Sequence, residues 1–380
     1  MENIELIATA PFGLEAAVAG EVRELGYTDV RAENGRVIFK ADAEAVCRCN
    51  LWLRTADRVL LKVGEFNAVS FEELFQQVRS LPWADLLPRR AAFPVQGRSL
   101  KSQLYSVPDC QAVTKKAIVE SLRETYRTEW FEEDGPLYQV EVSLWKDTAT
   151  VTVDTSGPGL HKRGYRGRAV EAPLKETLAA GLILLSRWYP DTALIDPFCG
   201  SGTIPVEAAL MGLNMAPGMN RSFTAEDWPQ VPQKLWDQAR REAKEKAVPS
   251  RGLDITGMDI DGDAVENARQ NAARAGVLHA VKLLNRSFKE IKAGGEYGKI
   301  ICNPPYGKRA GEEPGLEGLY REMGRIFSRL QTWSVYILTA YPHLEKAWGK
   351  KASKRRKLYN GRIEVHYYQY FGPRPRHNNL

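Results

Sequence analysis

Hydrophobic and polar residues over the first 66 positions follow the periods of amphipathic helices and short strands. Apolar side chains recur at helical spacing from Leu14 to Leu25, and Gly26 is suited to end that helix. The other elements expected here are strands at 4–8, near Val30, at 36–40 and at 58–65, and a helix at 43–53. The order strand-helix-strand-strand-helix-strand predicts a ferredoxin-like unit over residues 1–66.

The pattern changes over residues 67–156. Helices and short strands are expected at 71–78, 93–97, 101–105 and 108–125. Apolar residues alternate on both sides of Lys146 and Asp147, which predicts a hairpin. The segment 155–159 contains two glycines and a proline and predicts a linker. We therefore expect a second α+β domain over residues 67–156.

From residue 160 onward, short apolar strands alternate with helical stretches, which is typical of a doubly wound parallel sheet. The expected strands are 193–196, 254–258, 281–284, 299–302 and 334–339. Asn360-Gly361 separates two further apolar stretches and predicts a terminal antiparallel hairpin. The sequence thus predicts an α/β domain over 160–380. It carries a charged insertion at 212–250, which we expect to form a solvated surface helix.

Composition adds limits to this outline. Hydrophobic residues make up 43% of the 380 residues, the formal net charge is +6, and no apolar tract is long enough to span a membrane. The acidic N-terminus lacks the layout of a secretory signal, so we expect a cytoplasmic protein. The five cysteines and five histidines form no ligand cluster, so neither a disulfide framework nor a metal site is expected. The positive charge leans toward a polyanionic partner.

Three motifs carry candidate chemistry in the α/β domain. The first runs from Asp196 to Thr203 between a strand and a helix, where Gly200 and Gly202 allow a tight turn and a close approach to a ligand. The second contains Asp259 at the end of the next strand, where a carboxylate can accept hydrogen bonds from two ribose hydroxyls. Asp261 is better suited to cap the following helix.

The third motif is Asn303-Pro304-Pro305-Tyr306, directly after the strand at 299–302. The lone pair of an aryl amine is delocalised into its ring, so the amine is a poor nucleophile. The side-chain oxygen of Asn303 and the carbonyl of Pro304 can accept from such an NH2 group and favour localisation of the lone pair. The prolines hold both acceptors in place, and Tyr306 offers a face for stacking on an extruded base.

Together the three motifs resemble those of the class I methyltransferases that act on exocyclic amines of bases. The stretches 160–166 (Leu-His-Lys-Arg-Gly-Tyr-Arg) and 172–176 (Ala-Pro-Leu-Lys-Glu) narrow the resemblance to the RlmL-type 23S rRNA guanine-N2 methyltransferases, formerly described as N6-adenine-specific DNA methylases. That family carries an N-terminal ferredoxin-like subdomain and a THUMP RNA-binding domain. The resemblance covers nearly the whole chain and implies 23S rRNA as the partner.

The resemblance also implies a cofactor and roles for single residues. The cofactor is S-adenosylmethionine, and the residues expected to bind it are Lys175, Asp196, Phe198, Gly200, Gly202, Thr203, Asp259 and Ser287. Ser287 stands where such enzymes often place an Asp against the adenine amino group, so its side chain or backbone is the expected substitute. The residues implied for the base are Asn303, Pro304 and Tyr306.

Basic residues suggest where RNA is bound. Arg98 and Lys101 lie in the expected THUMP domain, and Arg163 and Arg166 flank Tyr165, an arrangement suited to phosphates and a stacked base. The basic run over 350–357 fits either a solvated face or RNA contact.

Two alternatives stay open at this stage. The third motif serves adenine N6 as well as guanine N2, so an adenine methyltransferase acting on DNA or RNA is one. A non-catalytic RNA-binding or ribosome-assembly factor with a vestigial pocket is the other, although all three motifs are intact.

Overall fold

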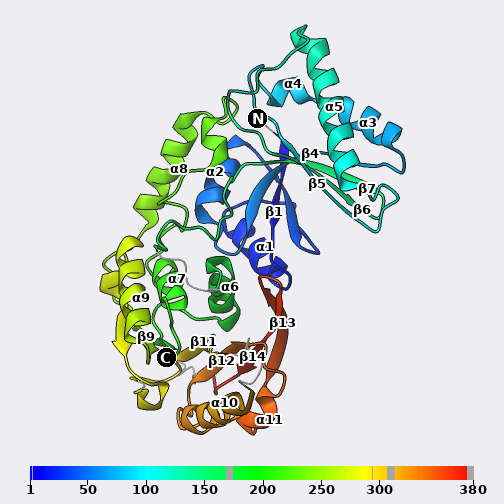
Figure 1. Ribbon diagram of the computed structural model, residues 1–380. Coiled ribbons are helices and arrows are strands. Elements are labelled where there is room, and N and C mark those ends of the chain that lie inside the picture. Colours follow the sequence, from blue (N-terminus) through cyan, green and yellow to red (C-terminus); the bar gives the residue numbers. More distant parts are fainter. Residues whose placement is uncertain (2, 168–173, 293, 306–312, 375–380) are drawn as a thin grey trace. The chain divides into compact units, whose positions relative to one another are not determined.

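The computed structural model describes residues 1, 3–167, 174–292, 294–305 and 313–374 (Figure 1). Two compact units make up the chain. The N-terminal unit comprises residues 1–10, 18–160 and 222–242. The C-terminal unit comprises residues 11–17, 161–221 and 243–380.

The predicted ferredoxin-like order of elements is confirmed. The elements are β1 (Ile4–Thr9), α1 (Glu15–Glu24), β2 (Arg31–Glu33), β3 (Arg36–Ala41), α2 (Ala43–Trp52) and β4 (Arg58–Asn67). Asp42 caps α2 by accepting a hydrogen bond from Ala45 N at 2.9 Å, which satisfies one free amide at the helix start.

The next elements add three strands to the same sheet and three helices. They are α3 (Phe71–Arg79), α4 (Trp83–Leu86), β5 (Val95–Leu100), α5 (Val107–Tyr126), β6 (Val140–Trp145) and β7 (Thr148–Asp154). Strand order is β2-β3-β1-β4-β7-β6-β5, so the antiparallel pair β4–β7 links the two predicted N-terminal domains in one sheet. The strand predicted at 101–105 is wrong, because Lys101 has a left-handed φ of 54° directly after β5.

The expected linker at 155–159 is a packed part of the N-terminal unit. Thr155 and Ser156 are fully buried. Thr155 N donates to Val59 O at 3.1 Å, and Ser156 Oγ donates to Asn50 Oδ1 at 2.6 Å. The sequence interpretation was wrong here because these small polar side chains find buried partners about a hundred residues away.

The insertion also differs from its prediction. It contains the short helix η1 (Thr224–Asp227) and α8 (Gln233–Lys246). Its two tryptophans, Trp228 and Trp236, are buried. Trp228 stacks on Tyr138 with ring centroids 4.4 Å apart, and its Nε1 donates to Leu137 O. The charged outer face of α8 suggested a solvated segment, but the aromatic residues build the middle of the insertion, residues 222–242, into the N-terminal unit.

The C-terminal unit is the predicted α/β domain. Its elements are α6 (Glu176–Ser186), β8 (Leu194–Asp196), α7 (Thr203–Gly212), β9 (Ile255–Asp259), α9 (Gly262–Arg274), η2 (Leu278–Ala280), β10 (Lys282–Asn285), η3 (Phe288–Glu290), β11 (Lys299–Cys302), α10 (Glu313–Phe327), β12 (Ser334–Thr339), α11 (Leu344–Trp348), β13 (Lys354–Asn360) and β14 (Ile363–Tyr370). Strand order is β10-β9-β8-β11-β12-β14-β13. The terminal hairpin is confirmed, with β14 antiparallel to both neighbours and Gly361 in the turn at φ 64°.

Helices cover both faces of this sheet (Figure 1). Successive residues of β11 point to opposite faces: Ile301 joins the core formed with α6, α7 and α9, and Ile300 joins the core formed with α10 and α11. The strand order reverses between β8 and β11. In open α/β sheets, ligands bind outside the carboxyl ends of the strands at such a reversal.

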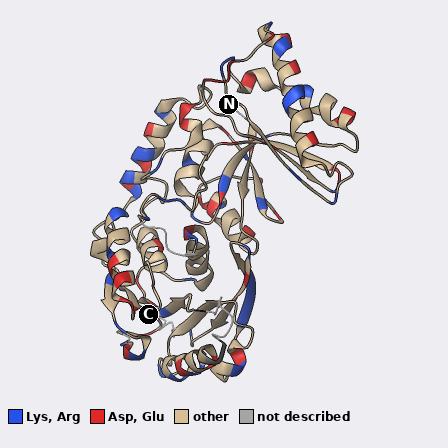
Figure 2. Ribbon diagram, in the orientation of Figure 1, with Lys and Arg blue, Asp and Glu red and all other residues tan. Residues whose placement is uncertain are grey.

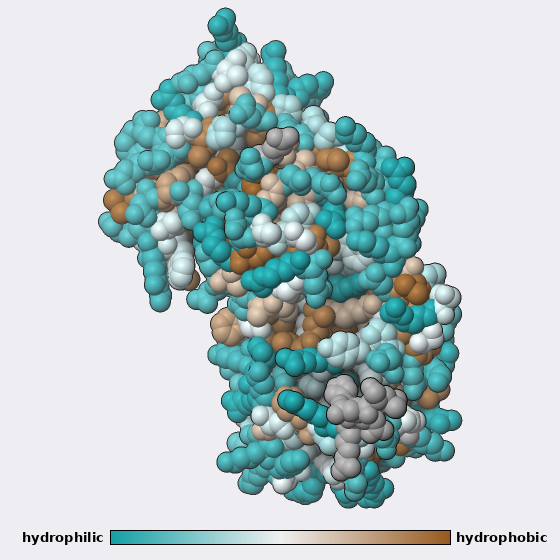
Figure 3. All heavy atoms as spheres, turned by 180° about the vertical axis from the view of Figure 1, so that it is seen from behind, coloured by the Kyte–Doolittle hydropathy of each residue, from teal (hydrophilic) through white to brown (hydrophobic). Residues whose placement is uncertain are grey.

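No helix within the described ranges is both long and apolar enough to cross a membrane. Figure 3 shows one face of the molecule, on which hydrophobic residues lie in small groups among hydrophilic ones.

Candidate active site

The strand register brings the three motifs together at the carboxyl ends of the strands of the C-terminal sheet. Asp196 is level with Gly257 on β9, and Ile195 is level with Ile300 on β11. Asp196 and Asp259 are the last residues of β8 and β9, and Asn303 directly follows β11, so all three stand at the carboxyl ends of neighbouring strands. The motifs therefore converge at the point where the strand order reverses.

Asp259 ties the glycine loop to the end of β9. Its two carboxylate oxygens accept hydrogen bonds from Gly200 N at 2.9 Å and from Asp261 N at 3.0 Å. Gly202 adopts a left-handed φ of 80° at the start of α7, and a Cβ there would lie 2.8 Å from the Cβ of Ala268. The loop thus needs glycine at this position. Asp261 caps α9 through Asp263 N and Ala264 N, as expected.

Asp196 is a buried carboxyl group with few neighbouring groups that stabilise its negative charge. It is 1% exposed and accepts a hydrogen bond from Phe198 N at 3.1 Å. Burial raises the pKa of Asp196 well above its usual range, and the nearby Asp259 carboxylate raises it further. A carboxyl group placed at such cost is suited to a cationic ligand group, which would favour its charged form.

Asn303 presents an acceptor without a donor. Its Oδ1 is buried, and no group among the described residues donates a hydrogen bond to it. A buried amide oxygen without a partner costs about 1–3 kcal/mol, so its presence at the end of β11 points to a donor supplied by a ligand. Pro304 is buried and Pro305 is exposed, and Pro305 O accepts from the hydroxyl of Tyr320 at 3.0 Å. Tyr306, the predicted stacking residue, lies outside the described residues.

The remaining predicted cofactor residues lie around this edge. Ser287 caps η3: its Oγ accepts from Lys289 N, and its N donates to Glu290. The sequence suggested that either the backbone or the side chain of Ser287 contacts the adenine. The backbone N–H already donates to Glu290, which leaves the hydroxyl proton for that contact. Phe288 is buried and packs against Phe198, with ring centroids 5.1 Å apart.

Lys175 directly precedes α6 and is half-buried. Arg166 Nη2 donates both to Leu174 O at 3.0 Å and to Thr203 Oγ1 at 3.1 Å. The residue before Lys175 therefore lies beside Thr203, the first residue of α7.

Arg163 and Tyr165 do not form the exposed RNA contact that the sequence suggested. They are 3% and 2% exposed. Both bind the buried Glu207 of α7: Arg163 Nη2 lies 3.5 Å from Glu207 Oε2, and the Tyr165 hydroxyl donates to Oε1 at 3.0 Å. We correct these two assignments, because a partner distant in sequence has drawn the side chains into the core. Arg166 pairs with the buried Glu176 but keeps 18% of its side chain exposed, so its RNA contact stays a prediction.

Sequence reasoning missed two residues at the site. Asn271 of α9 donates to Ser201 O in the glycine loop at 2.9 Å and accepts from Arg274 at 2.6 Å. Ile260 directly follows Asp259 and is 75% exposed, which is unusual for so large an apolar side chain. An apolar residue immediately after the acidic strand end was the available signal for Ile260. Nothing local in the sequence distinguished Asn271.

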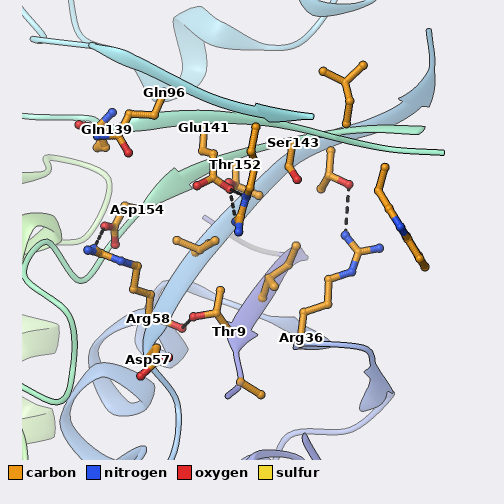
Figure 4. Close-up of a pocket in the computed structure, with 18 of the residues that line it drawn as sticks. Thr9, Arg36, Asp57, Arg58, Gln96, Gln139, Glu141, Ser143, Thr152 and Asp154 are labelled. Carbon is orange, nitrogen blue, oxygen red and sulfur yellow. Dashed lines mark hydrogen bonds and ion pairs between the residues drawn. The ribbon is translucent and has the colours of Figure 1, made fainter. Parts of the chain in front are cut away.

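The N-terminal unit holds a separate groove of about 1010 Å³ along one face of its sheet (Figure 4). None of the three motifs contributes to it. Arg98, one of the predicted RNA-binding residues, lines this groove and is 62% exposed, with its Nε donating to Glu141 at 2.9 Å. Lys101 is exposed just beyond the end of β5. Figure 4 shows that residues of β1 and β4 lie opposite residues of β5, β6 and β7 across the groove.

Among the described side chains, no group of three His, Cys, Asp or Glu residues could hold a metal ion. All five cysteines are free and buried.

The fold and the converging motifs define a class I methyltransferase domain preceded by α+β units. Three family models match the chain: the RMKL-like methyltransferase domain over residues 163–369, the RlmL ferredoxin-like domain over 5–60, and the THUMP domain over 68–154. The chain belongs to the RMKL-like methyltransferase family, with RlmL ferredoxin-like and THUMP domains before the methyltransferase domain.

Relatives of similar length share this organisation. “Putative RNA methyltransferase YpsC” of Bacillus subtilis (strain 168) is 51% identical over 373 residues, which are 98% of this chain and 97% of that protein. A crystal structure from Listeria monocytogenes str. 4b F2365, described as “a predicted N6-adenine-specific DNA methylase”, is also 51% identical, with a TM-score of 0.94 over 98% of this chain and 97% of that one. The crystal structure of SMU.472, “a putative methyltransferase complexed with SAH”, is 47% identical, with a TM-score of 0.93 over 98% and 99%.

Proposed function

We propose that this protein transfers a methyl group from S-adenosylmethionine to the exocyclic N2 amine of a guanine in RNA, with 23S rRNA as the substrate. The observation that carries the proposal is the buried Oδ1 of Asn303, which receives no hydrogen bond from any described residue and follows β11 in the sheet that also carries the glycine loop and Asp259. The RNA substrate is supported by the THUMP domain and by the relative named as an RNA methyltransferase. The cofactor is supported by the SAH complex of the 47% identical SMU.472.

The residues at the sheet edge fit this cofactor. Asp196, Phe198, Gly200 and Gly202 would hold its methionine part, and the buried Asp196 carboxyl group suits a cation there. Asp259 keeps lone pairs for the ribose hydroxyls, since each of its oxygens accepts one described hydrogen bond. The exposed face of Ile260 and the Ser287 hydroxyl would border the adenine. Lys175 and Thr203, at the starts of α6 and α7, would complete the cofactor site.

When bound, the cofactor supplies an electrophilic methyl group on a sulfonium sulfur. Asn303 Oδ1 accepts one N–H of the target amine and the Pro304 carbonyl accepts the other, which localises the nitrogen lone pair. The glycine loop and Asp259 would hold the cofactor so that its methyl group could pass to the amine nitrogen, with the electrons of the S–CH3 bond remaining on sulfur in the product S-adenosylhomocysteine. The methylated amine then loses a proton to solvent, so the reaction needs no strong base. Tyr306 would stack on the base.

Arg98 and Lys101 would bind RNA phosphates from the N-terminal unit. Their exposure supports this role, and the pairing of Arg98 with Glu141 holds its guanidinium in place.

Methylation of adenine N6 in DNA is the second candidate. The Asn303 motif serves both amines, and the Listeria relative carries that description. The THUMP domain favours RNA. A non-catalytic role is disfavoured, because a vestigial site would have no reason to retain the unpartnered acceptor of Asn303 or the buried Asp196.

The test is a competition between polymers. The protein is incubated with labelled S-adenosylmethionine and equal nucleotide concentrations of rRNA fragments and duplex DNA, and incorporation is measured in each. We expect label in RNA alone. Equal labelling of both polymers would overturn the preference for RNA, and failure to bind S-adenosylhomocysteine in calorimetry would overturn the enzymatic assignment.

A further inference from the structure

Strand β13 and the residues directly before it carry a concentration of positive charge that the catalytic motifs do not explain. The residues form what we call the basic strip: Lys350, Lys351, Lys354, Arg355, Arg356 and Lys357. Four of them are consecutive in β13, and Figure 2 shows this strand as continuously basic over its first half. Because side chains alternate along a strand, both faces of β13 are positive.

β13 is an edge strand, which leaves the strip accessible. It ends the strand order and pairs with β14. Lys354 and Lys351 are exposed, and Arg356 is half-buried. Lys357 is held by Glu364 at 2.6 Å, and Arg355 lies 3.1 Å from His366 Nε2. Within the described part of the chain, no carboxylate pairs with Lys354 or Arg356, so their charges are available to an anion.

The register fixes where the strip lies relative to the catalytic asparagine. Cys302 is level with Ile337 on β12, so Asn303 is level with Leu338. Leu338 is level with Tyr367 on β14, and Tyr367 is level with Arg356 on β13. Three strand spacings separate Asn303 from Arg356, which is about 14 Å. A base held at Asn303 therefore has its flanking nucleotides near the strip.

We propose that the basic strip binds phosphates of the RNA segment that flanks the target nucleotide. This inference rests on the proposed function and adds to it a binding surface on the methyltransferase domain itself. A base drawn into the site leaves its neighbours unstacked, and contacts to their phosphates hold the strand in register with Asn303. Lys354 and Arg356 supply the unpaired charges, whereas Arg355 is hydrogen-bonded to His366 and Lys357 is ion-paired with Glu364. Isolated lysines on edge strands commonly prevent strand-to-strand association, but that task does not require six basic residues in eight positions.

The test measures how RNA affinity depends on salt. The variant is Lys354→Gln with Arg356→Gln, and the matched control is Lys244→Gln with Lys282→Gln. The control pair is exposed in the same unit and removes equal charge away from β13. Binding of an rRNA fragment is titrated between about 50 and 200 mM salt. Each lost phosphate contact to a single strand lowers the slope of log K against log salt by about 0.7, so the strip variant should lose about 1.4 and bind about tenfold more weakly at the lower salt. The control should keep the wild-type slope.

Affinity for S-adenosylhomocysteine serves as the folding check and should be equal in all three proteins. A strip variant with the wild-type slope, or a control that loses as much slope as the strip variant, would overturn the proposal. Unchanged RNA binding together with new self-association would assign the strip to edge protection instead. If the wild-type protein neither bound nor methylated RNA, the proposed function would fail first, whereas wild-type methylation with an unaffected strip variant would reject this inference alone.

Discussion

Asn303 and Asp259 lie at the same sheet edge and have separable tasks. Asn303 holds a buried acceptor to which no described residue donates, whereas Asp259 uses its carboxylate to hold the glycine loop. If these tasks are as proposed, substitutions at the two positions should affect different measured quantities.

Asn303→Ala should lower kcat by about 10²- to 10³-fold, the usual cost of removing one preorganised hydrogen-bonding group from a reacting centre. The affinity for S-adenosylhomocysteine should stay within about twofold of wild type, because Asn303 faces the amine. Single-turnover kinetics and calorimetry measure the two quantities. Loss of cofactor binding in this variant would show that the role is misassigned.

Asp259→Ala should weaken S-adenosylhomocysteine by about 10- to 100-fold, since hydrogen bonds to a charged group contribute about 1.5–3 kcal/mol. Asp261→Ala is the matched control two residues away. It removes the α9 cap and should cost about 1 kcal/mol of stability with little change in cofactor affinity. Equal losses of affinity in both variants would mean that the turn, and not the carboxylate, determines binding.

The buried Asp196 predicts a dependence of stability on pH. Its pKa is raised above the ordinary value of 3.8, so the folded state holds the proton more tightly than the unfolded chain does. The contribution of this group to stability is therefore largest below about pH 4 and is lost as pH rises through the raised pKa. Asp196→Asn should remove this loss, so its advantage in Tm without cofactor should grow by a few degrees between about pH 4 and pH 8. The same variant should bind S-adenosylhomocysteine more weakly. A Tm difference independent of pH would contradict the account.

At the level of elements, sequence periodicity predicted the strands and helices of both units well. Each sheet strand of the C-terminal unit was expected within a few residues, because apolar strands bounded by glycine, proline and asparagine are local signals. Burial that depends on distant partners was not predictable. The sequence around Arg163 and Tyr165 suggests an RNA contact. In the structure both side chains instead contact Glu207, which follows Tyr165 by 42 positions. The three motifs were found because their residues follow strand ends.

The insertion gives the clearest stability prediction at this scale. Trp228→Ala should destabilise the N-terminal unit by about 3–5 kcal/mol, since it removes a buried ring stacked on Tyr138. Trp130→Ala is the control, because Trp130 is 75% exposed and its loss should stay within about 0.5 kcal/mol. Urea unfolding monitored by circular dichroism measures both. Equal small effects would restore the solvated-surface interpretation of the insertion.

At the scale of the whole molecule, one chain combines two sheets with different proposed tasks. The N-terminal sheet continues through the β4–β7 pair, so the ferredoxin-like and THUMP strands belong to one sheet. The C-terminal sheet carries the residues proposed to bind the cofactor, and its strand register relates Asn303 to the basic strip. This division of labour is consistent with an enzyme that must hold a large polymer while it modifies a single base.

The most direct test of the central claim is the identity of the methylated nucleoside. RNA treated with the protein and labelled S-adenosylmethionine is digested and its nucleosides are separated, with Asn303→Ala as the control. We predict N2-methylguanosine with the wild-type protein and none with the variant. N6-methyladenosine in its place, or N2-methylguanosine that persists at the wild-type level in Asn303→Ala, would contradict the account.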